Sequence, residues 1–295
     1  MKSETKEIYK NYLNLINEGL EKSINIEYPE KIYEAMRYSL LLGGKRLRPV
    51  MALETAKMLG GNSEEVLPSA LAIEMLHCQS LIHDDLPCMD NDDFRRGKPS
   101  NHKAFGEATA VLAGDAFLSY APKFIIDKTP ASVSKEAVLK VLREFFIAAG
   151  TDGIISGQIV DLDSEHKKID EKTLNFLYEY KTAKLFKLAV RTGGIIAGAD
   201  SEKLEALTKY AEYFGHAFQV YDDILDEIST FEEIGKTPKK DANVEKSNYV
   251  SLFGIDRAKQ RLTSLVNSAC DILKSNNLKS SLFEELARDL TERIN

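Results

Sequence analysis

Apolar residues recur at helical spacing along most of this chain, and the alternating pattern of a half-buried strand is almost absent. The periodicity predicts helices over residues 32–41, 67–82, 110–120, 138–149, 174–190, 204–225 and 255–273. Short breaks with Gly or Pro separate them, and no linker, low-complexity tract or clear repeat intervenes. Segment 67–82 is broadly apolar and is expected inside the bundle. With 43% hydrophobic residues, we predict an all-α fold: one domain, residues 1–295, of ten or more helices around a deep central cavity.

Charge and cysteine content narrow the class of protein. The chain has 39 Lys and Arg against 46 Asp and Glu, a net charge of −7, which argues against nucleic-acid binding because such proteins usually carry a basic footprint. Cys78, Cys88 and Cys270 show no CxxC spacing, so neither a disulfide framework nor a zinc site is indicated. The N-terminus is charged, and no run of about eighteen apolar residues occurs. We expect a cytoplasmic protein without membrane insertion.

Two acidic clusters, residues 84–90 and 222–226, lie far apart in the chain, each at the polar end of an apolar helical run. Asp222 and Asp226 are four residues apart and share a helix face with Gln219. In the first cluster Pro87 disfavours further helix, so Asp90 must return from a loop. Mg²⁺ prefers carboxylate oxygens and shares its remaining positions with water and substrate phosphates. The pair of clusters therefore indicates a diphosphate site, although either alone would also suit a solvated helix end.

Basic residues that could hold a phosphate flank the first cluster. Residues 43–49 place Lys45 and Arg48 beside two glycines, which lets the backbone turn around an anion, although a solvated helix start has the same composition. Arg95 and Arg96 follow the cluster directly and could clamp a diphosphate, or pair with Asp92 or Asp93 instead.

Polar residues within later helical segments are more ambiguous. Lys181 and Thr182 place a cation and a hydroxyl inside an amphipathic helix, where a surface position is the alternative, as it is for Lys236 and Lys246. Gln158 and Asp161 share one helix face, which suits either a polar pocket or ordinary packing.

Five motifs occur together and in order, and they resemble those of the trans-isoprenyl diphosphate synthases, in particular the short-chain farnesyl and geranylgeranyl types. They are GGKRLRP at residues 43–49, DDLPCMDNDDFRRGKP at 84–99, GQIVDL at 157–162, KTAKLF at 181–186 and FQVYDDILD at 218–226. The resemblance implies an all-α isoprenoid-synthase bundle, usually a homodimer. It also implies that isopentenyl diphosphate is joined to an allylic diphosphate with Mg²⁺, three ions when substrate is bound.

The resemblance also implies residue roles. Asp84, Asp90 and Asp222 match the metal ligands, supported by Asp85, Asp223 and Asp226, and with Arg95 and Lys181 they form the catalytic set. Positions that hold the allylic diphosphate are matched by Arg95, Lys181, Thr182, Gln219, Lys236 and Lys246. Positions that bind isopentenyl diphosphate are matched by Lys45, Arg48, His77 and Arg96.

Product length is expected to depend on two residues before the first motif, Gln79 and Ser80. In the farnesyl type an aromatic residue five positions before that motif commonly blocks the tunnel, but here the position is Gln79. A flexible Gln could let the chain grow further or could itself obstruct it. We favour the twenty-carbon geranylgeranyl product over the fifteen-carbon farnesyl product.

Three other functions share some of these features. A phosphohydrolase could use His83 and Asp84 as metal ligands, but no second His follows at ligand spacing. A non-catalytic regulatory subunit would tend to lose aspartates, whereas both clusters are whole. A terpene cyclase would have no need for Lys45, Arg48 and His77 at a second diphosphate.

Overall fold

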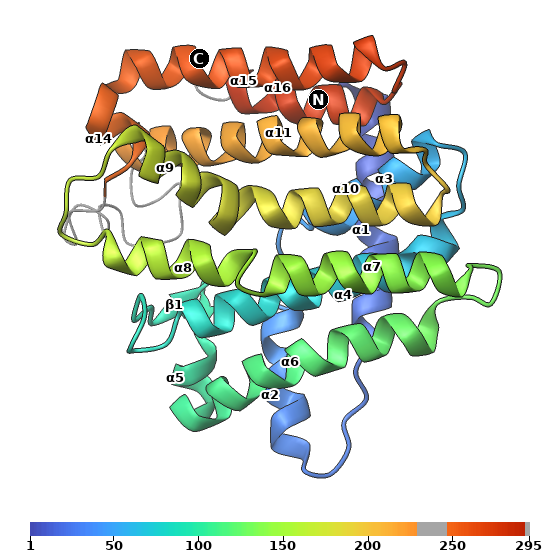
Figure 1. Cartoon of the computed structure of the whole chain (residues 1–295). Coiled ribbons are helices and arrows are strands. Elements are labelled where there is room, and N and C mark those ends of the chain that lie inside the picture. The colour runs from blue at the N-terminus through green and yellow to red at the C-terminus, as the bar shows by residue number, and fades with distance from the viewer. Residues whose placement is uncertain (229–246, 293–295) are drawn as a thin grey trace.

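The computed structural model describes residues 1–228 and 247–292, and this part of the chain is almost entirely helical (Figure 1). The helices are α1 (Ser3–Glu21), α2 (Glu30–Leu40), α3 (Leu47–Met58), α4 (Ser63–Asp84), α5 (Asn101–Phe105), α6 (Glu107–Lys128), α7 (Lys135–Ala149), α8 (Ile154–Asp163), α9 (Glu171–Leu177), the π-helix η1 (Tyr178–Ala183), α10 (Lys184–Ile196), α11 (Ser201–Ile228), α14 (Tyr249–Phe253), α15 (Ile255–Ser275) and α16 (Ser281–Glu292). The predicted all-α bundle of ten or more helices is confirmed.

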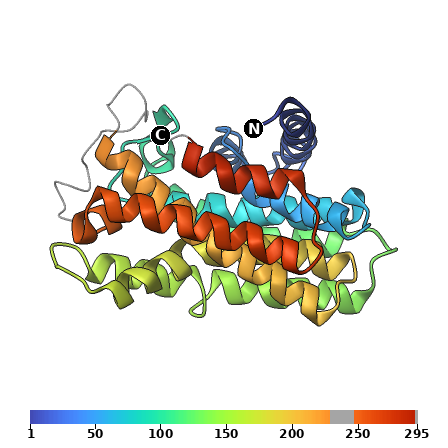
Figure 2. The ribbon, with the colours of Figure 1, turned by 90° about the horizontal axis from the view of Figure 1, so that it is seen from above.

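Helix α4 lies in the interior, where it packs against α3, α6 and α10. Its apolar residues surround the whole helix, and the side chains of Met75 and Leu76 are fully buried, as expected for an interior segment. Helices α15 and α16 cover α11 at the C-terminal end of the fold (Figure 2). The N-terminal amine lies 3.6 Å from the Asp289 carboxylate, so the start of the chain contacts α16.

Six helices of the described chain, α1, α3, α5, α8, α14 and α16, lie outside the segments that the periodicity predicts. Helix α1 buries only a narrow stripe, Thr5, Tyr12, Ile16 and Leu20, so most of its sequence is polar. Helix α3 is buried over most of its surface and therefore shows little amphipathic contrast. Pro49 fits in its first turn, where no intrahelical donor is lost.

The predicted helix at residues 174–190 is longer than expected and is not uniform. Helical backbone runs from Glu171 to Ile196, and the turns at Tyr178–Ala183 are π-helical. A π-turn widens the helix and is frequent at functional sites. Sequence periodicity does not reveal it, because the flanking turns keep ordinary α-helical spacing.

A short hairpin follows the first acidic cluster. Strands β1 (Phe94–Arg95) and β2 (Lys98–Pro99) pair antiparallel, and Arg96 and Gly97 between them have positive φ angles of 53° and 75°. This tight turn places Arg95 against Asp85, just after the end of α4, and Arg96 against the Gly43 carbonyl.

One stretch of the described chain, Lys135–Asp163, is long and apolar enough by length and composition to cross a membrane, and 28% of its apolar window is buried. Charged residues interrupt this stretch, so it holds no unbroken apolar run of about eighteen residues. In the fold the stretch forms two helices, α7 and α8, that are separated by residues 150–153.

Candidate active site

The first acidic cluster lies where α4 ends. Asp84 is the last residue of α4, and the chain then turns so that the Asp90 backbone N–H donates to the Asp84 carbonyl at 2.9 Å. Asp90 thus returns from a loop, as predicted. The Asp84 carboxylate accepts a hydrogen bond from the Gln158 amide of α8, and its Oδ1 lies 3.8 Å from Lys181 Nζ. Helix α8 and η1 therefore both reach the end of α4.

Arg95 is held by carboxylates of the same loop. Its Nε donates to the two carboxylate oxygens of Asp85 at 3.0 and 3.2 Å, and its Nη2 also contacts Asp85 and, at 3.2 Å, Asp92. The ion pair with Asp92, which the sequence left as an alternative, is present. Asp93 pairs instead with Lys103 at 2.8 Å. Arg95 lies beside the cluster, and its contact with a diphosphate stays a prediction.

Lys181 and Thr182 on η1 reach two parts of the site from one stretch of helix, Lys181 the first acidic cluster and Thr182 the Gln219 side chain one turn before the second. Lys181 Nζ lies 2.7 Å from Asp161 Oδ2 and close to Asp84, whereas the Thr182 hydroxyl donates to Gln219 Oε1 at 2.8 Å. Thr182 is 8% exposed, so the surface alternative does not hold for it. Lys181 is only partly buried, but it is paired rather than solvated.

Gly157 allows η1 to approach α8 this closely. A Cβ atom at this position would lie 2.5 Å from the Lys181 backbone nitrogen and 2.8 Å from the Tyr180 carbonyl carbon, so any larger side chain would force the helices apart. The polar-pocket interpretation of the motif at 157–162 is therefore the better one, because Gln158 and Asp161 both contact site residues.

In the second cluster Asp223 is buried and fully engaged by hydrogen bonds. Its Oδ1 accepts from Gln219 Nε2 at 3.3 Å, and its Oδ2 accepts from the Tyr178 hydroxyl and from the Tyr249 backbone N–H at 2.8 Å. Burial raises the pKa of Asp223 to about 6, even though these three hydrogen bonds lower it. In this arrangement Asp223 joins η1, α11 and the start of α14.

Asp222 and Asp226 lie differently from Asp223. Asp222 is half-buried and lies near Arg48, on whose pKa it acts, whereas Asp226 is exposed. Asp222 therefore faces the basic residues of the site, and the exposed Asp226 lies one turn later on the same helix.

The basic residues predicted to bind isopentenyl diphosphate lie near one another. Burial lowers the pKa of Arg48 to about 10, so this guanidinium stays charged at neutral pH. It lies 4.6 Å from the centre of the Phe186 ring. Arg96 donates to the carbonyl of Gly43 and crosses so close to Gly44 that a Cβ atom there would lie 2.6 Å from the guanidinium carbon. The hairpin thereby joins residues 43–49 to the first cluster.

His77 lies among these cations and is half-buried. Burial, followed by the charges of Arg48, Arg96, Arg46 and Arg95, lowers its pKa well below the usual value, so it is neutral at pH 7. Lys45 is exposed, with Nζ 5.7 Å from the centre of the Phe218 ring. A neutral imidazole among arginines can donate to or accept from an anion without adding charge.

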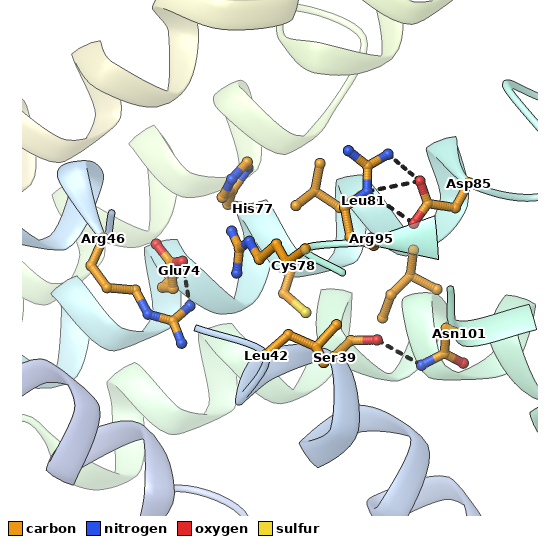
Figure 3. A pocket seen from close by; sticks show the side chains of 12 residues that line it. Ser39, Leu42, Arg46, Glu74, His77, Cys78, Leu81, Asp85, Arg95 and Asn101 are labelled. Carbon is orange, nitrogen blue, oxygen red and sulfur yellow. Dashed lines mark hydrogen bonds and ion pairs between the residues drawn. The ribbon is translucent and has the colours of Figure 1, made fainter. Parts of the chain in front are cut away.

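A small cavity of about 20 Å³, room for about one water molecule, lies beside these residues. Figure 3 shows the side chains that line it. His77, Cys78, Asp85 and Arg95 line it. The Arg46–Glu74 ion pair, 2.7 Å long and buried, forms its far wall. The cavity extends the basic site, whereas the deep apolar tunnel expected from the sequence stays a prediction.

The electrostatics of Asp84 suit a divalent cation. Its pKa is raised to about 6, first by burial and then by the neighbouring carboxylates of Asp90 and Asp161, whereas Lys181 and Arg95 lower it. A cation between such carboxylates would relieve their repulsion. Among residues 1–228 and 247–292, no three His, Cys, Asp or Glu side chains are grouped closely enough to hold a metal by themselves. Mg²⁺ commonly takes one or two carboxylates together with substrate phosphates, so the donor set fits.

Several residues at the site were not identified from the sequence. Tyr178 and Tyr249 contact Asp223 of the catalytic set, and Glu179 of η1 pairs with Lys187, but a tyrosine or a glutamate in a helix carries no motif signal of its own. Lys236 and Lys246 lie outside the described residues. Ser80 donates to the His77 carbonyl at 2.8 Å, within its own helix.

Comparison with known proteins agrees with this geometry. A family model for polyprenyl synthetase matches residues 29–286. The chain belongs to the polyprenyl synthetase family. As a member of it, this polyprenyl synthetase is a prenyltransferase, and the resemblance stated from the sequence motifs is confirmed.

Named relatives of this polyprenyl synthetase differ in product. Geranylgeranyl pyrophosphate synthase 7 of Arabidopsis thaliana is 44% identical over 87% of this chain and 74% of its own length. Farnesyl diphosphate synthase of Micrococcus luteus is 43% identical over 90% of both chains. The structure of a geranyltransferase from Helicobacter pylori, complexed with magnesium and isoprenyl diphosphate, has a TM-score of 0.85 at 30% identity and covers 100% of this chain and 98% of that one.

Proposed function

We propose that this polyprenyl synthetase condenses isopentenyl diphosphate with the allylic dimethylallyl, geranyl or farnesyl diphosphate, and that geranylgeranyl diphosphate is its main product. One observation carries the proposal. Consecutive residues of η1, Lys181 and Thr182, contact the first acidic cluster and the Gln219 side of the second. Arg48 and Arg96, from two further segments, add positive charge beside this pair.

Basic and polar side chains perform two tasks in this reaction. Lys181, Thr182, Gln219 and Arg95 hold the allylic diphosphate, and their positive charge and donors stabilise it as the allylic C–O bond breaks. Lys45, Arg48, His77 and Arg96 hold isopentenyl diphosphate so that its double bond faces the allylic carbon, which is a positioning effect. A new C–C bond forms, and the released diphosphate takes the proton that the intermediate loses. No nucleophilic side chain is needed.

Asp84, Asp90 and Asp222 would hold Mg²⁺, with three ions expected when substrate is bound. When bound, Mg²⁺ supplies charge neutralisation for the departing diphosphate. The arrangement of Asp85 supports this proposal, since Arg95 occupies both of its oxygens and leaves Asp84 as the carboxylate directed toward Lys181.

The proposed twenty-carbon product rests on Gln79. The two relatives named above share nearly the same identity with this chain and carry different product names, so overall similarity does not decide between them. Gln79 has no aromatic ring to close the tunnel, and its amide is held by His83 at 3.1 Å, within the same helix. This contact favours an open path for the growing chain.

We further propose that the enzyme is a cytoplasmic homodimer. Seven large apolar side chains of α6, α7 and α8 are more than a third exposed: Val111, Leu112, Ile126, Leu139, Phe146, Ile155 and Ile159. These helices are consecutive and in contact in the order α6, α7, α8. Exposed apolar surface of this kind commonly marks an interface. The three cysteines are free, which suits a reducing compartment.

The test is an incubation with isopentenyl diphosphate, Mg²⁺ and each allylic diphosphate in turn, followed by chromatography of the prenyl products. We expect elongation that ceases when the metal is chelated, with twenty-carbon product dominant. Absence of elongation with every primer would reject the proposal. Release of phosphate or diphosphate without elongation would favour a phosphohydrolase. A cyclic hydrocarbon product would favour a cyclase, and activity only with an added subunit would favour a regulatory role.

A further inference from the structure

We infer that His83 and Gly114 are specificity-determining residues, which position Gln79 and thereby set product length. The inference rests on the proposed function, because it concerns which chain length the tunnel admits. It goes beyond the motif residues, since neither His83 nor Gly114 was assigned a role in chain length.

The contact between Gln79 and His83 fixes the Gln79 side chain. Both residues lie on α4, four positions apart and so on the same face. Gln79 Nε2 lies 3.1 Å from His83 Nδ1, and Gln79 is only 7% exposed. An amide nitrogen can only donate, so His83 Nδ1 accepts in this pair.

His83 is in turn held by α6. Its Nε2 lies 3.1 Å from the carbonyl oxygen of Val111, an atom that can only accept. The two contacts require one neutral tautomer, protonated at Nε2, that accepts from Gln79 and donates to Val111. Asp115 lies farther away, 3.9 Å from the same nitrogen. The imidazole therefore connects Gln79 on α4 to the backbone of α6.

Gly114 makes this arrangement possible. A Cβ atom at Gly114 would lie 2.0 Å from His83 Nε2 and 2.3 Å from Cδ2, far inside contact distance. The ring occupies the space where α6 has no side chain. Any larger residue at position 114 would displace the ring and leave the Gln79 amide without its acceptor.

Loss of the contact would shorten the product. A buried amide without a partner is unfavourable, so it draws in water or turns across the neighbouring space to find one. Either change opposes an apolar chain that must grow along this part of α4. Held by His83, the Gln79 amide is satisfied and kept along its own helix.

The experiment compares two variants that remove the contact with two control variants. His83→Leu and Gly114→Ala remove the contact, whereas His83→Asn keeps an acceptor near the position of Nδ1. Gly194→Ala is the control for a glycine replaced within a helix, since the nearest atom to its added Cβ, Leu204 Cδ1, would be 3.0 Å away on a flexible side chain. All are measured for the ratio of twenty- to fifteen-carbon product and for the rate of the first condensation.

We expect the product ratio to fall about fivefold in His83→Leu and Gly114→Ala, the size expected when one buried amide loses its partner. It should be retained in His83→Asn and Gly194→Ala, with the first condensation little changed in Gly114→Ala. In a Gln79→Leu background the effect of Gly114→Ala should disappear. An unchanged ratio in both His83→Leu and Gly114→Ala would overturn the inference.

A second measurement does not depend on activity. The side-chain amide resonances of Gln79, identified in a ¹⁵N-labelled protein by their loss in Gln79→Leu, should shift in Gly114→Ala and His83→Leu but not in Gly194→Ala. Resonances that stay in place in both variants would refute the contact. Failure of the wild type to elongate any primer would instead reject the proposed function, and the resonances would still decide whether His83 positions Gln79.

Discussion

Lys181 Nζ lies 3.8 Å from Asp84 Oδ1, although the two residues are almost one hundred positions apart in the chain. The contact forms because η1 widens the helix at Tyr178–Ala183 and Gly157 lets α8 approach it. Asp161 on α8 completes the arrangement, 2.7 Å from the same ammonium group. A cation is thereby placed at the edge of the carboxylates that would hold the metal.

Replacement of Lys181 by Ala should lower kcat/KM about 10²-fold, the typical cost of losing one group that stabilises developing charge. Lys184→Ala is the matched control, because Lys184 is on the same helix but its Nζ lies over the Tyr180 ring, 4.4 Å from its centre. Steady-state kinetics with geranyl diphosphate compare the two. Equal losses would show that the charge of the helix as a whole matters and not Lys181.

Asp84→Asn should stabilise the metal-free protein at neutral pH while abolishing activity. The pKa of Asp84 is raised from 3.8 to about 6, so its proton is held more tightly in the folded state. The contribution of the protonated carboxyl to the free energy of unfolding is fully present below pH 4 and is lost as the pH rises through 6. Above that pH, the buried charge costs on the order of 3 kcal/mol. The Asn variant carries no such charge. Its free energy of unfolding in urea should therefore exceed that of the wild type by an amount that grows between pH 4 and pH 7.

The control for Asp84 is the stabilisation that Mg²⁺ and inorganic diphosphate together give to the folded protein. The wild type should be stabilised against unfolding by the pair of ligands, because binding to the folded state alone raises stability. Asp84→Asn should gain little. Equal stabilisation of both proteins would show that Asp84 does not hold the metal.

Glu179 should contribute stability that disappears in acid. Burial raises its pKa, but hydrogen bonds from His216 and Lys187 outweigh burial and lower it from 4.5 to about 2. Its stabilisation is therefore present above pH 4.5 and lost as the pH falls toward 2. Glu179→Gln should lower the free energy of unfolding by about 2 kcal/mol at pH 7, and the difference should shrink toward pH 3.

The control for Glu179 is Glu212, which contacts the same Lys187 at 3.1 Å but is 47% exposed. Exposed ion pairs contribute little, so Glu212→Gln should change stability by less than about 0.5 kcal/mol. Comparable losses in the two variants would mean that the buried hydrogen bonds of Glu179 contribute no more to stability than an exposed ion pair.

Phe146→Asp should yield a monomer. Phe146 is 57% exposed on α7, within the apolar surface formed by α6, α7 and α8, and a charge buried in an interface is unfavourable. Sedimentation or light scattering should give about 33 kDa for this variant and twice that for the wild type. Leu15→Asp, at an apolar position of α1 that is 37% exposed, should leave the mass of the assembly unchanged. A wild-type monomer would contradict the proposed homodimer.

Much of this architecture could be predicted from the sequence, because a half-buried helix leaves apolar residues at helical spacing. The amphipathic helices could be read from spacing, and Pro87 correctly indicated that Asp90 returns from a loop. Helix α3 was not predicted, because it is buried over most of its surface and so shows little contrast between its faces. The π-turn at Tyr178–Ala183 could not be predicted from spacing, and its surroundings, α8 at Gly157 and the contacts of Glu179 with Lys187 and His216, come from other parts of the chain.

The site was predictable as a set of motifs but not as a set of contacts. Spacing put Asp222, Asp226 and Gln219 on one face, yet it did not show that Asp223 is held by Tyr178 and the Tyr249 backbone. Partners that come from distant helices leave no local pattern. For the same reason the contact of His83 with the Val111 carbonyl of α6 could not be predicted from local spacing.

The most direct test of the account counts two products of one reaction. Isopentenyl diphosphate and geranyl diphosphate are supplied with Mg²⁺, and both the diphosphate released and the five-carbon units joined to the primer are measured over time. The account predicts that one diphosphate is released for each unit joined, with the count of units ending at the twenty-carbon chain. Diphosphate released in large excess over units joined, or no units joined at all, would contradict it.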